Sequence, residues 1–364
     1  MFNLEKKKKK KHIILGAGGT GGHMFPAEAA AHYFAEKGYN ITLITDVRGM
    51  RFGDNFKNYN IIELPAANIR AGGMMKRFKS ALLLIKSIWM AFKIILEVKP
   101  DLVIGFGGYP SFPAGVAAVF TRTPLYLHEQ NAIIGRTNKF LLRFSKNIFC
   151  SFRNTKGIQN HIKAIAVGNP VRHQILNYID MPRKDQDKFQ ILVTGGSQGA
   201  RIFTEIMPLC FGLLPKEMKE KIHIIHQSRP EDCDETRELY ETYNVSCSVL
   251  PFIENMGDAI IQSDLVVCRS GASTLSELAA LGRVGLFVPL PTSADDQQKI
   301  NAEAFVKSWA GKLIEQKDLS PSLLASVIAE FFNNPERKVK MENNAKKLAN
   351  IDAAKAIFES CIDI

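Results

Sequence analysis

Short apolar runs alternate with longer amphipathic segments along the chain. Residues 12–15 form an apolar run, residues 25–36 have the apolar spacing of a helix, and residues 41–45 form a second run. Runs of this length predict buried strands, and Gly38 ends the predicted helix between them. The order of strand, helix and strand is typical of a parallel sheet covered by helices.

The second half of the chain repeats this pattern. Residues 189–193 predict a strand, the sequence TGGSQG at 194–199 predicts a glycine-rich loop, and residues 200–214 predict a helix. Apolar runs at 102–105 and 265–268 continue the alternation in each half. We therefore predict an α/β protein with two Rossmann-like, doubly wound domains that face each other across a cleft.

A turn and a polar segment separate the two halves. The turn is Gly168-Asn169-Pro170, and the charged residues 180–188 come before the first strand of the second half. The expected parts are a disordered lysine-rich tail at 1–11, a first domain at 12–170 and a second domain at 171–349.

Length and composition agree with this organisation. A chain of 364 residues is too long for one ordinary core, and 46% hydrophobic with 23% charged residues is typical of a globular protein. The six cysteines show neither a C-x-x-C pair nor zinc spacing, and the N-terminus has no signal-peptide pattern. A reducing cytosol is the expected compartment.

The chain is basic, with a formal net charge of +11. Residues 5–11 supply +5 of this charge, and +6 remains on the folded part. A lysine run of this kind is typically a solvated, disordered end, and a dedicated membrane or nucleic-acid arm is the alternative. The remaining positive charge favours anionic partners such as phosphates or acidic lipids.

The first glycine-rich loop, GAGGTGGHMFPA at 16–27, has two interpretations. The spacing Gly16-x-Gly18-x-x-Gly21, with Asp46 after the next strand, fits a dinucleotide-binding turn and a nicotinamide oxidoreductase. The loop is longer than such a turn requires, however, and His23 opens the following helix as a candidate general base. A second glycine-rich loop in the other half favours a reaction between two large substrates.

The segment RSGASTLSELAALG at 269–282 predicts a nucleotide-binding helix start. A strand ends at Cys268 and a helix begins near Thr274, so free backbone N–H groups converge where a diphosphate would bind. Glu277, one turn into the helix, would accept hydrogen bonds from two ribose hydroxyls. The alternative is an ordinary capping box formed by Ser273 or Thr274 with Glu277.

A polar cluster follows the next predicted strand. The strand covers 286–289, and the cluster is ADDQQ at 294–298, whose carboxylates and amides together suit a hydroxyl-rich ligand such as a sugar. Two D-x-D sequences, at 185–187 and 232–234, have the spacing found in metal-dependent sugar transferases. Both lie in charged segments predicted as loops, and no metal site is expected.

An ordered set of motifs resembles one family of glycosyltransferases. The set is GAGGTGGH, GFGGYPSFPAG at 105–115, HEQNAIIGRTNK at 128–139, VGNPVR at 167–172, VTGGSQGAR at 193–201, PFIENM at 251–256, RSGASTLSELAALG and DDQQKINA. The set resembles the MurG family, which transfers N-acetylglucosamine to the lipid-linked muramyl-pentapeptide of peptidoglycan synthesis. The resemblance runs nearly end to end, and its departures are Val284, where relatives often have proline, and the lysine tail.

The resemblance implies the GT-B fold and an inverting transferase. The second domain would hold UDP-N-acetylglucosamine, the first would hold the lipid-linked acceptor, and a C-terminal helix within 350–364 would pack back on the first domain. His23 would be the base that deprotonates the 4-hydroxyl of the N-acetylmuramyl sugar, Glu129 would be a second carboxylate near the acceptor, and no cofactor is implied. A two-domain UDP-sugar epimerase is a rival class with a similar fold.

The resemblance also implies which residues bind the donor. They are Thr20, Gly21, Gly22, Asn131, Arg172, Ser197, Ile253, Gly271, Ala272, Ser273, Thr274, Leu275, Ser276, Glu277, Gln297 and Gln298. Within this set, Ile253 would hydrogen-bond uracil through its backbone.

Residues 74–98 combine an apolar stripe with a basic fringe. The stripe, at helical spacing, consists of Phe78, Leu82, Ile85, Trp89, Phe92 and Leu96, with Lys76, Arg77 and Lys79 beside its first turn. Lys86 and Lys93 interrupt the segment, so a transmembrane span is not expected. The segment is either a core helix or a docking surface for an anionic membrane.

These features together define the expected partners. They are UDP-N-acetylglucosamine, undecaprenyl-diphosphate-linked muramyl-pentapeptide, an anionic membrane surface at the cytoplasmic face of the inner membrane, and other cell-wall synthesis or division proteins. Nucleic acid is not an expected partner.

Overall fold

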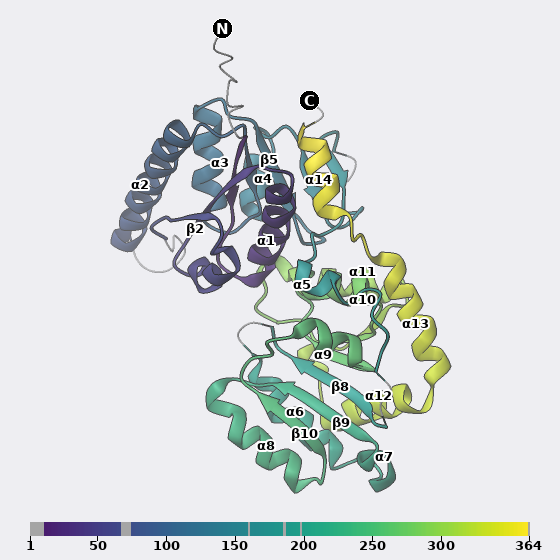
Figure 1. Ribbon diagram of the computed structural model, residues 1–364. Coiled ribbons are helices and arrows are strands. Elements are labelled where there is room, and N and C mark those ends of the chain that lie inside the picture. The colour runs from purple at the N-terminus through teal and green to yellow at the C-terminus, as the bar shows by residue number, and fades with distance from the viewer. Residues whose placement is uncertain (1–10, 67–73, 159–160, 185–186, 197–198, 363–364) are drawn as a thin grey trace. The chain divides into compact units, whose positions relative to one another are not determined.

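The structure, a computed structural model, describes residues 11–66, 74–158, 161–184, 187–196 and 199–362. The chain divides into two compact units. The first contains the described residues up to Gln130, Ile134–Pro170 and those from Asp352 on, and the second contains Asn131–Ile133 and Val171–Ile351. Figure 1 shows the chain passing from the first unit, in purple and blue, into the second, in green.

The first unit is built on a parallel sheet in which seven strands are described, in the order β3-β2-β1-β4-β5-β6-β7. The strands are β1 (His12–Gly16), β2 (Asn40–Thr45), β3 (Asn60–Glu63), β4 (Leu102–Gly105), β5 (Leu125–Glu129), β6 (Ile148–Cys150) and β7 (Ala164–Ala166). The helices are α1 (Gly21–Glu36), α2 (Met74–Val98), α3 (Ser111–Phe120), α4 (Arg136–Leu141) and α14 (Ala353–Ile362), with a 3₁₀ segment, η1 (Gly49–Phe56).

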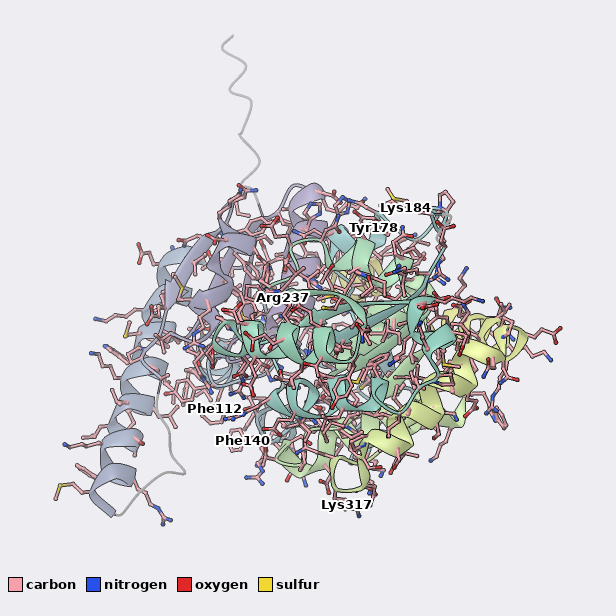
Figure 2. All side chains as sticks on the ribbon, turned by 90° about the horizontal axis from the view of Figure 1, so that it is seen from below. Phe112, Phe140, Tyr178, Lys184, Arg237 and Lys317 are labelled. Carbon is pink, nitrogen blue, oxygen red and sulfur yellow. The ribbon has the colours of Figure 1, made fainter. Side chains whose placement is uncertain are left out.

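Helices cover both faces of this sheet, because successive side chains of a strand point to opposite sides. In β1, Ile13 and Leu15 pack into a core with α1 and α14, whereas Ile14 packs into a second core with α2 and α3. Figure 1 shows α1 and α14 on one side of the sheet and α2 and α3 on the other. The α3 and α4 helices also touch each other through Phe112 and Phe140, whose ring centroids are 5.2 Å apart (Figure 2).

The last helix, α14, completes the core of the first unit. Its Phe358 ring lies 5.3 to 5.6 Å, between centroids, from the rings of Tyr33, Phe34 and Tyr39 on and beside α1. Ile357 is fully buried in the same core. The C-terminal segment therefore belongs to the first unit even though the second unit lies between them in the sequence.

The α2 helix buries a narrow stripe of mainly small side chains against α3. Ser80, Ser87, Ala91 and Ile95 are buried, and the Ser87 hydroxyl donates a hydrogen bond to Pro65 O at 2.8 Å. Most of the large apolar side chains of the stripe predicted from the sequence lie on the outer surface instead. Interpreting that stripe as the buried face of a core helix is therefore wrong, because small residues allow the closer approach to α3.

The second unit has the same design. Its parallel sheet has six described strands in the order β10-β9-β8-β11-β12-β13. The strands are β8 (Phe189–Thr194), β9 (Ile222–Gln227), β10 (Ser246–Leu250), β11 (Leu265–Cys268), β12 (Gly285–Phe287) and β13 (Gly311–Leu313). The helices are α5 (His173–Leu176), α6 (Arg201–Phe211), α7 (Lys216–Glu220), α8 (Cys233–Thr242), α9 (Met256–Gln262), α10 (Ala272–Leu281), α11 (Gln297–Lys307), α12 (Pro321–Asn333) and α13 (Pro335–Leu348), with 3₁₀ segments η2 (Pro230–Asp232), η3 (Ala294–Asp296) and η4 (Gln316–Asp318). The predicted pair of doubly wound α/β domains is thus confirmed.

The strand order places one switch point in each sheet. In the first unit the order reverses between β1 and β4, and in the second between β8 and β11. Ligands of such sheets bind beyond the carboxyl ends of the strands at this point, because the neighbouring loops turn away in opposite directions. The glycine-rich loops follow β1 and β8, so both lie at switch points.

A buried carboxylate links three segments of the second unit. Asp264, just before β11, accepts hydrogen bonds from Arg183 Nη1 at 2.6 Å, from the backbone N–H of Gln190 at 2.8 Å, and from Lys338. Burial alone would raise the pKa of Asp264, but these donors outweigh it and hold the pKa below its usual value.

We predict that Asp264→Ala lowers the free energy of unfolding of the second unit by about 3 to 5 kcal/mol at pH 7, because two cations lose their buried carboxylate. Urea unfolding measures the loss. Since folding depresses the pKa of Asp264, its contribution is complete at neutral pH and disappears as the pH falls below about 4 and through the folded pKa. Asp258→Ala, which removes the exposed partner of Lys184, is the control and should cost less than about 1 kcal/mol. Equal losses in the two variants would contradict the prediction.

Candidate functional site

The α1 helix begins directly after the first glycine-rich loop. Thr20 is its N-cap, in an extended conformation, with no hydrogen bond from its side chain to the helix. The backbone N–H groups of His23 and Met24 both donate to Thr20 O at 3.1 Å. The helix thus starts four residues earlier than residues 25–36 suggested, because tertiary packing outweighs the low helix propensity of Gly21 and Gly22.

Asp46 stabilises the glycine-rich loop through hydrogen bonds. Its Oδ1 accepts hydrogen bonds from the backbone N–H groups of Gly19 at 3.1 Å and Gly49 at 2.9 Å, and its Oδ2 lies 3.2 Å from Arg48 Nη2. The carboxylate is fully buried. It is therefore not available to bind a ribose, as the nicotinamide interpretation required, and that interpretation is not supported.

The loop after β4 lies directly on the loop after β1. Gly108 has a φ of +75°, and a Cβ built on it would lie 2.3 Å from Gly18 O. Gly107 has a φ of +91°, and a Cβ there would lie 2.9 Å from the His23 ring. Only glycine permits this backbone at these two positions, so the pair fixes how closely the GFGGYPSFPAG motif covers His23.

His23 is half-buried at the start of α1 and makes a specific polar contact. Its Nδ1 lies 3.1 Å from Oε1 of Gln130, the residue that directly follows β5. Gln130 and His128 are both buried, and their side chains are hydrogen-bonded to each other. The structure thus connects the GAGGTGGH and HEQNAIIGRTNK motifs within the first unit, a connection that the sequence did not indicate.

Glu129 supports the turn that follows β5. Its Oε2 accepts hydrogen bonds from the backbone N–H of Gly135 at 2.8 Å and from Asn138 Nδ2 at 2.9 Å. Its side chain is buried. These contacts give Glu129 a structural role, and its geometry offers no support for a catalytic carboxylate.

In the second unit, α10 begins without a side-chain cap. Gly271 is the N-cap, and the backbone N–H of Leu275 donates a hydrogen bond to Gly271 O at 3.1 Å. The alternative of a capping box is wrong, because the helix starts at Ala272 and has no side-chain cap. The Ser273 hydroxyl, inside the first turn, has no partner among the described residues. The first-turn N–H groups and a buried hydroxyl are therefore available to an anionic ligand.

Glu277 lies one turn further along α10 and is held by an arginine. Arg172 Nε and Nη2 lie 2.8 and 2.7 Å from Glu277 Oε1. The two side chains are only 12% and 7% exposed. The ion pair orients the carboxylate and brings Arg172 to the same helix start. Two residues that were predicted separately as donor-binding residues are therefore in direct contact.

Three residues that the sequence analysis did not assign hold the loops around α10. Arg269 donates to Val288 O and Pro289 O at 3.0 Å each, which ties the β11 end to the segment after β12. The Ser270 hydroxyl donates to Gln298 O at 2.8 Å. The third is Asn301, fully buried, whose Nδ2 lies 3.1 Å from Asn131 Oδ1 and whose Oδ1 accepts from the N–H of Ala132 at 2.8 Å. Their partners are too distant in sequence for a local pattern to reveal them.

The ADDQQ segment has a strained backbone. Asp295 and Asp296 have φ values of 50° and 54°, a left-handed conformation that costs non-glycine residues about 1 to 3 kcal/mol each. Gln298 Oε1 accepts from the N–H of Leu290 at 2.9 Å, and Gln297 lies half-buried beside it. Such strain clusters at ligand sites because the surrounding structure must enforce it.

The remaining predicted donor residues occupy different environments. Ile253, after β10, and Leu275 are buried in the second unit. The Ser276 hydroxyl donates back to Ala272 O at 2.9 Å, and Thr274 is half-buried. Ser197 lies outside the described residues.

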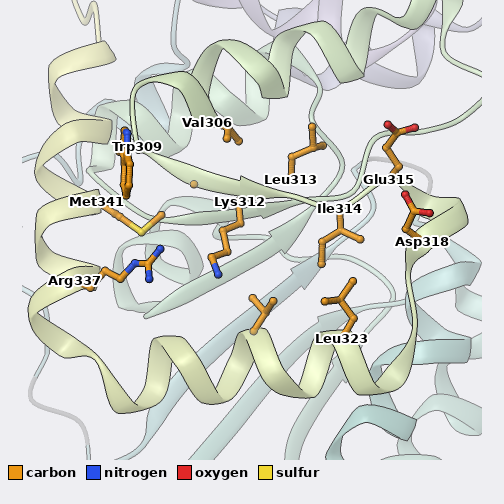
Figure 3. Close-up of a pocket in the computed structure, with 12 residues that line it drawn as sticks. Val306, Trp309, Lys312, Leu313, Ile314, Glu315, Asp318, Leu323, Arg337 and Met341 are labelled. Atoms are coloured by element: carbon orange, nitrogen blue, oxygen red, sulfur yellow. The ribbon is translucent and has the colours of Figure 1, made fainter.

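A separate cavity of about 790 Å³ lies beside the edge strand β13 (Figure 3). Its lining includes Trp309, Lys312, Arg337 and Met341, and none of the predicted site residues. Arg337 Nη1 and Lys312 both pair with Glu330, which leaves their charges compensated. This cavity is therefore separate from the residues predicted to bind substrate.

Both halves of the chain match the domains of one enzyme family. Residues 13–150 match the Glycosyltransferase family 28 N-terminal domain, and residues 190–357 match the Glycosyltransferase family 28 C-terminal domain. Among solved structures, Acinetobacter baumannii MurG has a TM-score of 0.78 and 30% identity, covering 97% of this chain and 100% of that one. A UDP-GlcNAc 2-epimerase from Neisseria meningitidis has a TM-score of 0.68 at 16% identity, with 98% and 100% covered, which shows a shared fold alone.

Curated relatives extend over almost the whole chain. The UDP-N-acetylglucosamine--N-acetylmuramyl-(pentapeptide) pyrophosphoryl-undecaprenol N-acetylglucosamine transferase of Rhizobium etli (strain CIAT 652) is 38% identical over 350 residues, 95% of this chain and 94% of the relative. The transferase of the same name from Caulobacter vibrioides (strain NA1000 / CB15N) is 35% identical over 352 residues, 96% of this chain and 98% of the relative. The chain therefore belongs to glycosyltransferase family 28 and, within it, to the MurG transferases.

Proposed function

We propose that the chain transfers N-acetylglucosamine from UDP-N-acetylglucosamine to the 4-hydroxyl of the N-acetylmuramyl sugar of undecaprenyl-diphosphate-linked muramyl-pentapeptide. The observation that carries this proposal is the identity of 35 to 38% with transferases of that name along about 95% of the chain. Both substrates are anionic, which agrees with the positive charge of the folded part.

The start of α10 is the proposed site for the diphosphate of the donor. Uncapped N–H groups and the helix dipole favour negative charge there, and the buried Ser273 hydroxyl adds an unused donor. The Glu277 carboxylate, held through Oε1 by Arg172, would accept hydrogen bonds from the ribose hydroxyls. Arg172 lies close enough to the same helix start to stabilise charge that develops on the departing UDP.

His23 is the proposed general base of the reaction. The sugar hydroxyl of the acceptor must lose a proton as it attacks the anomeric carbon, and attack from the face opposite UDP inverts that carbon. The protein then supplies a base on the first unit and charge stabilisation on the second.

The outer face of α2 is the proposed membrane-docking surface. Phe78, Leu82, Ile85 and Trp89 are each more than half exposed, and the Trp89 ring lies under Lys93 Nζ, 5.4 Å from the ring centroid. Side chains project outward along this helix in Figure 2. No helix in the described part of the chain is long and apolar enough to cross a bilayer.

An exposed apolar patch with a basic fringe suits the surface of an anionic membrane. Arg77 and Lys79 are exposed beside the patch, and the Lys76 side chain lies outside the described residues. Docking at the cytoplasmic face of the inner membrane would bring the enzyme to an acceptor whose polyprenyl tail stays in the lipid. The same location would place it near other cell-wall synthesis and division proteins.

We predict that His23→Ala lowers turnover by about two to four powers of ten, the usual effect of losing a general base, while UDP binding stays near normal. Turnover at saturating acceptor and calorimetric titration with UDP measure the two effects. The matched control is His32→Ala, on the same helix, because the His32 side chain is 43% exposed and lies 3.4 Å from the exposed Glu36 carboxylate. Full turnover of the His23 variant would remove it from the mechanism.

We predict that Glu277→Gln weakens UDP-sugar binding about ten- to hundred-fold and changes turnover at saturating donor much less, because the ribose is remote from the bond that forms. Donor titration tests this expectation. Glu342→Gln is the control, since Glu342 forms a similarly shielded ion pair with Arg283 away from the helix start. The Glu342 side chain is 15% exposed and the Arg283 side chain 12%. Unchanged donor affinity in Glu277→Gln would contradict the assignment.

We predict that replacing Lys76, Arg77 and Lys79 by serine weakens co-sedimentation with anionic vesicles about hundred-fold at low salt, since each charge adds about 1 kcal/mol near the surface. Replacing three lysines of the second unit, Lys216, Lys340 and Lys347, makes the same charge change and should have little effect. A deletion of residues 1–11 separates the contribution of the tail. Vesicle binding that depends on the tail alone would show that α2 is not the docking surface.

A further inference from the structure

A chain of hydrogen bonds runs from His23 into the buried interior of the first unit. His23 Nδ1 contacts Gln130 Oε1 at 3.1 Å, Gln130 Nε2 contacts His128 Nδ1 at 3.0 Å, and His128 Nε2 contacts Gly168 O at 3.1 Å. We propose that Gln130 and His128 are positioning residues that hold His23 in the tautomer with its proton on Nδ1, so that Nε2 is the basic nitrogen. The inference rests on the proposed role of His23 as the base.

The orientation of the Gln130 amide determines the first link. One of its two polar atoms lies 2.8 Å from Phe106 O, a carbonyl that can only accept a hydrogen bond. That atom must be the amide nitrogen, Nε2. The amide oxygen then faces His23, and because this oxygen can only accept, His23 Nδ1 must carry the proton.

His128 supports this orientation from the other side. Gln130 Nε2 donates its second proton to His128 Nδ1, which must therefore be unprotonated, and His128 Nε2–H donates to Gly168 O. Burial lowers the pKa of His128 to about 4, so the ring is neutral at physiological pH. A charged His128 would place an N–H against the amide nitrogen and favour the opposite orientation.

Packing holds the same residues in place. The His128 ring lies 5.4 Å, between centroids, from the buried Phe106 ring, and His128, Phe106 and Gln130 are each almost completely buried. Gly107 leaves the space that the His23 ring occupies. The links come from the ends of β4 and β5 and the start of α1, so a rigid sheet edge fixes the base.

A base with one fixed tautomer has a catalytic advantage. A free imidazole distributes its proton between both nitrogens, and only the form with an unprotonated Nε2 accepts the proton from the hydroxyl. Nε2 has no hydrogen-bond partner among the described residues, so it remains available to a substrate. In the Ser-His-Asp triad of serine proteases, a variant that imposes the wrong histidine tautomer keeps the geometry but lowers kcat by about 10⁴-fold. A fixed tautomer is therefore expected to affect kcat more than binding.

The test is a nitrogen-15 spectrum of the full chain with labelled histidine, at pH 7, in which comparison with His23→Ala assigns the His23 signals. We expect a protonated Nδ1 and an unprotonated Nε2. In Gln130→Met, which keeps the length but not the amide, we expect a mixture of tautomers and a kcat about ten- to hundred-fold lower with KM nearly unchanged. His128→Asn, whose Oδ1 can replace Nδ1 as acceptor, should preserve both the tautomer and most of the turnover.

Each result separates this inference from the proposed function. A His23 ring protonated on Nε2 in the wild type would overturn the inference, even if His23→Ala is inactive and the assignment of the base survives. An unchanged tautomer and kcat in a folded Gln130→Met, checked by thermal unfolding and UDP binding, would also overturn it. If that variant does not fold, the wild-type spectrum still decides. Full turnover of His23→Ala would instead overturn the base assignment on which the inference rests.

Discussion

The side-by-side pairing of β1 with β4, and of β8 with β11, is the constraint on which the rest of each unit depends. In register, Ile14 lies opposite Val103 in the first sheet and Leu192 opposite Val266 in the second. The strands are parallel, so their carboxyl ends emerge at one edge and the loops diverge there. Most residues predicted to contact a substrate lie on loops or in the first turns of helices that follow these strand ends.

The two switch points are built differently, in agreement with the different roles proposed for them. In the second unit, the helix start is left uncapped, and Arg269, Ser270 and Asn301 hold the surrounding loops through backbone and amide contacts. These contacts would fix the N–H donors of the proposed anion site. In the first unit, the glycine-rich loops pack against each other so tightly that a histidine can be held between them, with its polar partner buried beneath.

The sequence alone predicted the sheets well because apolar runs such as 12–15 and 189–193 are long, buried and bounded by glycine. The helix starts were less predictable, since the packing of the loops, and not helix propensity, moves the beginning of α1 to Gly21. The buried face of α2 could not be deduced either. The α2 helix is apolar on two sides, and the side with small residues faces inward because it packs against α3.

The contacts that orient site residues were the least predictable from the sequence. Arg172 and Glu277 are 105 positions apart, and His23 and Gln130 are 107 positions apart. No local periodicity connects such positions, although the motif resemblance named three of the four. Gln130 stood inside the HEQN motif without an assigned role, because only the carbonyl of Phe106 shows which way its amide points.

The most direct measurement of the central claim is transfer by the purified full chain with labelled UDP-N-acetylglucosamine and undecaprenyl-diphosphate-linked muramyl-pentapeptide. The account predicts that the label moves into the lipid-extractable fraction only when the acceptor is present, as an N-acetylglucosamine joined to the 4-hydroxyl of the muramyl sugar with inversion. Label that stays in the nucleotide sugar with the acceptor present, or that appears in an epimer of it, would contradict the account.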